Sequence, residues 1–336
     1  MKSVKTQLAE GRFSGAYLLY GEEDYLKDYY CRAIVEKTVD PAMRDFNYLA
    51  YSSKCDCAAA GAFLDAFPVM AEQKTLVIRN TGLFQKPNAE EKEFWAAALK
   101  NLPDYAVVVF VEPAVDKRSA LFKAVNSNYT AEEFKKQKTN DLLSWAQRIL
   151  RSYGKTMAKP DLELVIENAD GRMLQIKNEL DKLCHYSGDT TAISREMVER
   201  ITCRTAENRI FQMIDHIAAG RGAQAIAECN DLKTLKEQPV GVITLIARQY
   251  TILRKIKVLG THTAAVAIAK ECGIPEFSVK KYLPMANALS RHALDTAIHL
   301  CQQADFAVKS GKREGWLAAD LLIGQLLDLS ASPGGK

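Results

Sequence analysis

The chain has 336 residues, and its 45 lysines and arginines against 41 aspartates and glutamates give a formal net charge of +4. Hydrophobic residues make up 48% of it, yet no run of about 18 apolar residues occurs, so we expect a soluble globular protein of two or three domains without a membrane span. The opening residues lack the apolar stretch of a signal peptide, and the scattered cysteines favour reduced thiols in the cytoplasm.

Apolar runs and amphipathic segments alternate over residues 1–137, which predicts a parallel sheet with helices on its faces. The expected strands are 16–21, 46–52, 74–80 and 105–112. The expected helices are 25–39, 57–68, 89–102 and 117–127. The second of these helices is expected to end at Pro68, because proline interrupts a helix. Residues 129–135 close this α/β unit.

The strand pattern disappears beyond residue 138, and helices are expected up to the end of the chain. Thr139 and Asn140 are candidate caps at the start of the first helix, and Gly154 is a favoured residue just past its end. Ser194 is the expected cap of a later helix. Further helices are expected at 159–171, 173–188, 194–202, 208–220, 239–260, 275–289, 291–311 and 314–329.

The stretch YLLYGEEDYLKD (17–28) joins a strand to a helix and partly matches the phosphate-binding P-loop, G-x-x-x-x-G-K-[ST]. Gly21 and Lys27 stand at the positions of the first glycine and the lysine. Leu26 replaces the second glycine, which lets the backbone approach the phosphates, and Asp28 replaces the hydroxyl that holds magnesium. Three acidic residues directly after the first glycine would also repel a triphosphate. We therefore expect strand–turn–helix geometry without nucleotide binding, and no cofactor.

Several stretches, each degenerate alone, have a specific order and spacing over nearly the whole chain. They are AYLLYGEEDYLKDYY, YAVVVFVEPAVDKRSALFKAV, DGRMLQIKNELDKL, RIFQMIDHIAAGRGAQAI, LIARQYTILRKIKVL, CGIPEFSVKKYLPMA and ADFAVKSG. With an α/β domain at 1–137, a small helical domain at 138–208 and a larger one at 209–336, the chain resembles the delta-subunit family of bacterial DNA polymerase III clamp loaders.

The resemblance implies an AAA+-like (RecA-type) first domain that has lost its ATPase parts, a helical lid domain and a C-terminal helical collar domain. It implies a subunit of the DNA polymerase III holoenzyme that is not itself catalytic and that binds the β-type sliding clamp and helps to open it during replication. The implied partners are this clamp, the ATPase and delta-prime-type subunits through the collar, and primed DNA in the assembled complex. Energy would come from ATP on the neighbouring subunits.

Within that resemblance, two further ATPase features are missing. If residues 74–80 form the Walker B strand, Arg79 and Asn80 stand where carboxylates would bind magnesium. The Ser-Arg-Cys motif of the family's ATP-sensing subunits does not occur in the sequence. Both departures agree with the loss of nucleotide chemistry that the 17–28 loop indicates.

The resemblance places the clamp contact within LDAFPVMAEQKTLVI (64–78), at the end of the helix before the third strand. The apolar pair expected to enter the clamp's hydrophobic pocket falls on Val69 and Met70, with Phe67 as a larger anchor just before it. The family's usual pair includes leucine or phenylalanine, so this pair is a departure, although methionine fills irregular pockets well. The alternative is that these three residues are ordinary core residues near a loop.

Two groups of basic residues are possible contacts to DNA or to other subunits. They are Lys117 and Arg118 in one helix and Arg248, Arg254 and Lys255 in another. A solvated helix face is the simpler explanation of the second group. No aromatic platform for base stacking accompanies either group, so single-strand binding by the chain alone is not expected.

Two other functions stay open on the sequence alone. One is an active P-loop ATPase acting on nucleic acid, in which Lys27 still binds phosphate. The other is a helical scaffold for an unrelated assembly, which would have no affinity for a clamp. Assays of nucleotide binding and clamp binding by the purified chain discriminate among the three functions.

Overall fold

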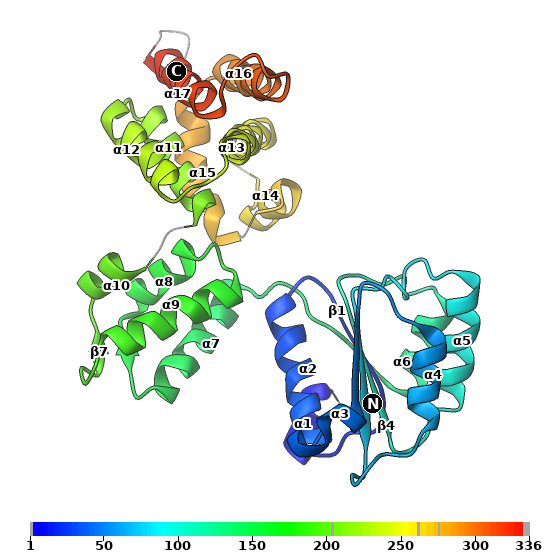
Figure 1. Cartoon of the computed structure of the whole chain (residues 1–336). Helices are drawn as coiled ribbons and strands as arrows, with labels where there is room; N and C mark the ends of the chain where they lie inside the picture. The colour runs from blue at the N-terminus through cyan, green and yellow to red at the C-terminus, as the bar shows by residue number, and fades with distance from the viewer. Residues whose placement is uncertain (1–2, 203–204, 261–262, 275, 332–336) are drawn as a thin grey trace. The chain divides into compact units, whose positions relative to one another are not determined.

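The computed structural model describes residues 3–202, 205–260, 263–274 and 276–331 (Figure 1). The chain forms two compact units, Met1–Gln137 and Lys138–Lys336, and each unit has a hydrophobic core of its own. No helix in the described ranges combines the length and the apolar character that a bilayer span requires.

The first unit is built on a five-stranded parallel sheet. Its strands are β1 (Gly15–Tyr20), β2 (Tyr48–Ser52), β3 (Lys74–Arg79), β4 (Ala106–Glu112) and β5 (Thr130–Glu133), in the order β2-β3-β4-β1-β5. All seven residues of β4 are buried, because a strand in the middle of a sheet covered on both faces has no side turned to water. β4 aligns Phe110 with Leu18 of β1 and Val109 with Val77 of β3.

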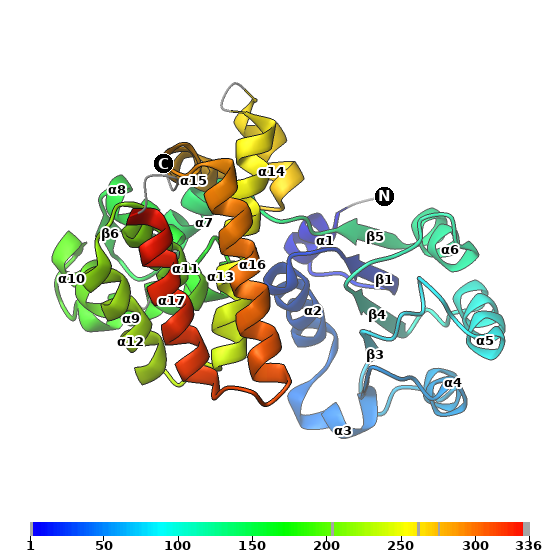
Figure 2. The same cartoon turned by 90° about the horizontal axis from the view of Figure 1, so that it is seen from above.

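Helices cover both faces of this sheet. They are α1 (Val4–Glu10), α2 (Asp24–Thr38), α3 (Arg44–Asn47), α4 (Cys57–Asp65), α5 (Ala89–Lys100) and α6 (Ala120–Asn128), with a 3-10 turn at Pro41–Met43. Figures 1 and 2 show α1 and α2 on one face and α4, α5 and α6 on the other. Ile34 lies in the apolar layer of the first face, and Trp95 and Leu121 in that of the second. The predicted α/β unit with a parallel sheet is confirmed.

The second unit is almost entirely helical. Up to residue 201 it comprises α7 (Thr139–Ser152), β6 (Thr156–Met157), α8 (Lys159–Asn168), α9 (Met173–Tyr186), β7 (Ala192–Ile193) and α10 (Arg195–Ile201). It continues with α11 (Ala206–Ala218), α12 (Gly222–Thr234), α13 (Pro239–Leu259), α14 (Ala265–Cys272), a 3-10 turn (Glu276–Ser278), α15 (Val279–Ala288), α16 (Arg291–Lys309) and α17 (Gly315–Ala331). The long helix α13 packs against α11, α14, α15, α16 and α17. The expected domain boundary at 208/209 falls inside this unit and stays a prediction.

Several expectations about secondary structure were wrong. The N-cap of α7 is Lys138, which makes no side-chain cap, so Thr139 is already the first helical residue. α4 ends at Asp65 and not at Pro68, because Ala66 already has an extended backbone, with a φ of −74° and a ψ of 137°. In the helical half, β6 and β7 form a parallel ladder of two residues each, which is too short to leave an alternating pattern in the sequence.

Two other predicted helix ends, at Ser194 and Gly154, are confirmed. Ser194 caps α10 by accepting a hydrogen bond from Met197 N–H, as its hydroxyl next to an apolar-periodic segment predicts. Gly154 follows α7 with a φ of +67°, the left-handed conformation in which helices often end. The helix expected from residue 275 begins at Val279, and residue 275 itself lies outside the described ranges.

Candidate functional site

The loop between β1 and α2, where the P-loop pattern lies, is filled by the chain itself. Gly21 has a φ of +120°, and a Cβ built on it would lie 2.4 Å from the carbonyl oxygen of Phe134. That oxygen accepts a hydrogen bond of 3.0 Å from Glu23 N–H, and Phe134 N–H donates to the Tyr20 carbonyl at 2.7 Å. The glycine therefore permits the close approach of the segment after β5 in the place where a P-loop receives phosphate.

Lys27 is buried beneath this loop, with only 2% of its surface exposed. Its ammonium group donates to the carbonyl oxygens of Gly21 at 2.6 Å and Glu112 at 3.3 Å. It also forms an ion pair of 2.9 Å with Asp24. An ammonium group has three donors, so partners within the chain occupy all of them. In a working P-loop the same group reaches the β- and γ-phosphates.

Asp28 and Arg79, predicted as broken P-loop and Walker B positions, contact each other. The Arg79 guanidinium donates to the Asp28 carboxylate and, at 3.2 Å, to Sγ of Cys31. The next residue, Asn80, takes a φ of +53° and donates its N–H to the Val111 carbonyl at 2.9 Å. Neither Walker B position therefore offers a carboxylate, and the acid at the P-loop position is neutralised by an arginine. Over the ranges that the structure describes, no three His, Cys, Asp or Glu side chains are grouped as metal ligands would be.

Glu112, a buried acid that the sequence analysis missed, ends β4 beside this site. Its carboxylate accepts hydrogen bonds from Thr81 N–H at 3.1 Å, the Thr81 hydroxyl at 2.7 Å and Gly82 N–H at 3.1 Å. These three donors provide the hydrogen bonds that the buried carboxylate requires, and the same bonds fix the turn after β3. The available signal was an acid at the end of the most apolar strand of the chain.

The segment between α4 and β3 exposes apolar side chains, and we call its residues 66–70 the tip. Phe67 is 78% exposed, Val69 42% and Met70 83%. The alternative that these three are core residues is therefore wrong. Met70 has a φ of +48°, a conformation that residues other than glycine seldom adopt. The Phe67 ring lies against Tyr105, with 5.3 Å between the ring centres.

The base of the tip is held by side chains from other segments. The Tyr105 hydroxyl lies 3.2 Å from the carbonyl oxygens of both Leu64 and Asp65 at the end of α4. The buried ammonium group of Lys74 donates to the Ala66 carbonyl at 2.8 Å, and burial lowers the pKa of Lys74. The carbonyls at the end of a helix lack partners inside the helix, so these contacts complete the end of α4.

Asn47, at the end of α3, holds the backbone of the tip through its side chain. It is fully buried, and its amide exchanges two hydrogen bonds of 2.8 Å with the backbone of Val69. Local periodicity does not indicate a role for Asn47, Lys74 or Tyr105, because their partners lie 22, 8 and 40 or 41 residues away. Only the lysine offered a signal, since it stands at the start of a strand with an apolar centre.

The predicted basic contacts lie in different units, and most of them are paired within the chain. The ion pairs are Lys117–Glu133 (2.8 Å), Arg118–Asp116 (3.0 Å), Arg248–Glu207 (2.7 Å) and Arg254–Asp295 (2.6 Å). Lys255 is exposed on α13. The contact of these residues with DNA or with other subunits stays a prediction.

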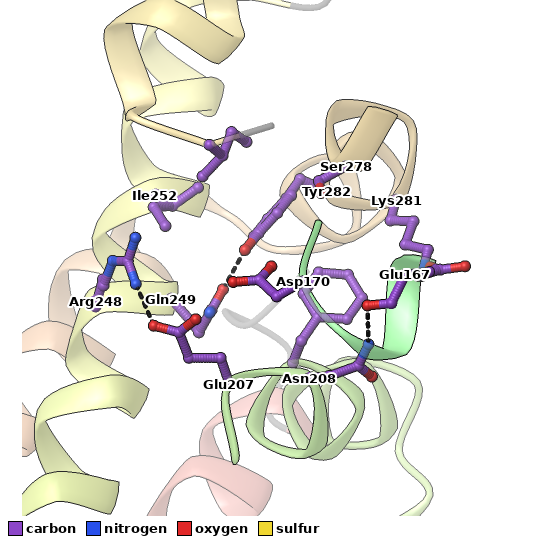
Figure 3. Close-up of a pocket in the computed structure, with 12 residues that line it drawn as sticks. Glu167, Asp170, Glu207, Asn208, Arg248, Gln249, Ile252, Ser278, Lys281 and Tyr282 are labelled. Carbon is purple, nitrogen blue, oxygen red and sulfur yellow. Dashed lines mark hydrogen bonds and ion pairs between the residues drawn. The ribbon is translucent and has the colours of Figure 1, made fainter. Parts of the chain in front are cut away.

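A cavity of about 60 Å³ lies among α8, α11, α13 and α15 of the second unit (Figure 3). Glu207 accepts hydrogen bonds of 2.7 Å from both Arg248 and Arg172, and the latter lies 3.6 Å from Asp170. Burial, and after it the neighbouring carboxyl of Glu207, raises the pKa of Asp170 to about 7. Ligand pockets usually measure several hundred cubic ångströms, so this cavity is too small for a nucleotide.

Comparison with known proteins identifies the family. The model for "DNA polymerase III, delta subunit" matches residues 17–135, and that for "DNA polymerase III delta subunit, C-terminal domain" matches residues 207–326. The DNA polymerase III subunit delta of Bacillus subtilis (strain 168) is 26% identical in an alignment of 333 residues, and the match covers 96% of this chain and 96% of that protein.

A solved structure, the DNA clamp loader delta protein of Bacillus subtilis, has a TM-score of 0.69 to this chain. It is 24% identical, and the match covers 97% of this chain and 98% of that chain. This likeness confirms the predicted fold class, a parallel-sheet α/β domain followed by a helical part. With both family models matched in the expected order, the chain belongs to the DNA polymerase III delta subunit family of bacterial clamp loaders.

Proposed function

We propose that this chain binds a ring-shaped sliding clamp through the tip and favours the opened clamp during its loading onto primed DNA. The observation that carries the proposal is the exposure of Phe67, Val69 and Met70 on a backbone held by buried polar side chains. Apolar anchors that enter a partner's pocket dominate the energetics of protein interfaces. Full burial of one such side chain contributes roughly 1.5–3 kcal/mol.

The proposed role needs no nucleotide chemistry in this chain. The ammonium group of Lys27 contacts Gly21, Glu112 and Asp24, which occupy its three donors. The guanidinium of Arg79 pairs with the carboxylate of Asp28. A binding protein opens a clamp only by its greater affinity for the open form than for the closed one. ATP would therefore act through neighbouring subunits, which the collar formed by α11–α17 would hold together with this chain.

The competing function, an ATPase acting on nucleic acid, requires an ammonium group on Lys27 that is free to meet phosphate. Saturable binding of a fluorescent ATP analogue, or release of phosphate by the purified chain, would support that function.

Titration of the purified chain against its cognate clamp, by surface plasmon resonance, tests the proposal. The variant with both Val69→Ser and Met70→Ser should bind at least about tenfold more weakly, since each change removes an apolar anchor. Val266→Ser and Phe306→Ser are matched controls, because these side chains are 61% and 62% exposed in the second unit. Unaltered affinity of the double variant would show that the tip is not the clamp contact.

A further inference from the structure

Asn47 connects the tip to the interior of the first unit. It is the last residue of α3, directly before β2, and none of its surface is exposed. Its Oδ1 accepts a hydrogen bond from Val69 N–H and its Nδ2 donates to the Val69 carbonyl, both at 2.8 Å. A side-chain amide has the same donor and acceptor as a peptide group, so the two bonds fix both the position and the orientation of Val69.

The residues on either side of Val69 restrict the tip further. The Ala66 carbonyl is held by the buried lysine at the start of β3. Pro68 lies between these two fixed points, and its ring fixes its own φ. On the other side, Met70 is held in a left-handed conformation with a φ of +48°. The backbone is therefore ordered over a segment whose side chains face solvent.

We propose that Asn47 is a positioning residue that holds the tip in the conformation in which it binds the clamp. The inference rests on the proposed function of the tip. A segment that is ordered before it binds loses little conformational freedom on binding, so its apolar contacts yield more affinity than those of a flexible loop. Asn47 is buried beneath the tip, so it acts through Val69 and not by contact with the clamp.

Two substitutions of Asn47 test how its side-chain amide holds the backbone of Val69. Asn47→Ala removes both hydrogen bonds and leaves the N–H and the carbonyl of Val69 without these partners. Asn47→Asp keeps the size of the side chain and an acceptor for Val69 N–H, but it sets a carboxylate oxygen against the Val69 carbonyl. Both changes should make the backbone of the tip more mobile, and Asn47→Asp should do so without creating a cavity.

The experiment combines clamp binding with amide hydrogen exchange in the full chain. In both variants, exchange at Val69 N–H should accelerate while the amides of β3 keep their protection, and the Kd for the clamp should rise about tenfold. Binding should also show a more unfavourable entropy, because the tip is then ordered at the moment of binding. A matched control is Asn168→Ala in the second unit, where a buried asparagine donates to the Thr202 hydroxyl at 3.1 Å. This control should leave the clamp Kd unchanged.

Combining a substitution of Asn47 with one in the tip distinguishes a positioning role of Asn47 from a general loss of stability of the first unit. In the Val69→Ser background, Asn47→Asp should lower affinity by much less than it does in the wild-type chain, because the anchor that it orients is gone. If the variant with both Val69→Ser and Met70→Ser loses clamp binding but Asn47→Asp binds like wild type with fast exchange at Val69, the proposed function stands and the positioning role is overturned. If the double variant binds normally, the proposed function itself fails.

Discussion

Arg79 at the end of β3 and Asp28 in the second turn of α2 form an ion pair. In a P-loop ATPase the corresponding segments share a magnesium ion, which supplies positive charge next to the phosphates. Here a guanidinium supplies the positive charge, and Cys31 Sγ accepts a further hydrogen bond from it. The charged groups at the end of β3 and in α2 are thus paired with one another, and these contacts stabilise the fold of the first unit.

The first prediction concerns Lys27. Lys27→Met should lower the free energy of unfolding of the first unit by about 1–3 kcal/mol, because it leaves the Gly21 and Glu112 carbonyls without a donor in a buried site. Urea denaturation measures the change, with Lys37→Met at an exposed position of the same helix as the control. A lysine kept for phosphate would give the opposite pattern, with stability intact and ATP affinity lost.

The second prediction separates stability from binding at Met70. Met70→Gly should raise the unfolding free energy by about 1 kcal/mol, because glycine adopts a positive φ without strain and the methionine side chain makes little contact. The same change should weaken clamp binding. Leu235→Gly is the control, since Leu235 is also exposed but has a φ of −75°, where glycine gives no relief. A loss of stability in Met70→Gly equal to that of the control would contradict the account.

The sequence predicts the sheet of the first unit to a greater extent than it predicts the tip. The parallel sheet was predictable, because β4 and its neighbours are near-continuous apolar runs that only a doubly covered sheet accommodates. The place of the tip followed only from the family resemblance. Arg79 and Asp28 were each singled out as departures from a motif, yet their pairing across 51 residues of chain leaves no local pattern. The same holds for the amide of Asn47, whose partner is fixed by tertiary structure alone.

The third prediction is a dependence of stability on pH in the second unit. The pKa of Asp170 is about 7 in the folded chain against an ordinary value of 3.8, so the folded state retains a proton that the unfolded state releases between these values. Stability should therefore fall as the pH rises from 5 to 7 and level off above, by on the order of 1 kcal/mol after solvent screening. The pKa of Glu207 is lowered, so its opposite contribution is lost only at more acidic pH, below this window.

Thermal unfolding of Asp170→Asn at several pH values measures this contribution. The variant should lose the fall in stability between pH 5 and 7, because asparagine does not titrate. Asp189→Asn, at an exposed position, should behave like the wild type. A wild-type slope that persists in Asp170→Asn would assign the pH dependence to another group.

The most direct test of the central claim is a calorimetric titration of the isolated chain with its cognate clamp, carried out with and without magnesium and ATP. The account predicts a saturable Kd that nucleotide leaves unchanged and that Val69→Ser with Met70→Ser raises at least about tenfold. A Kd that depends on ATP, or one that survives the loss of both anchors, would contradict it.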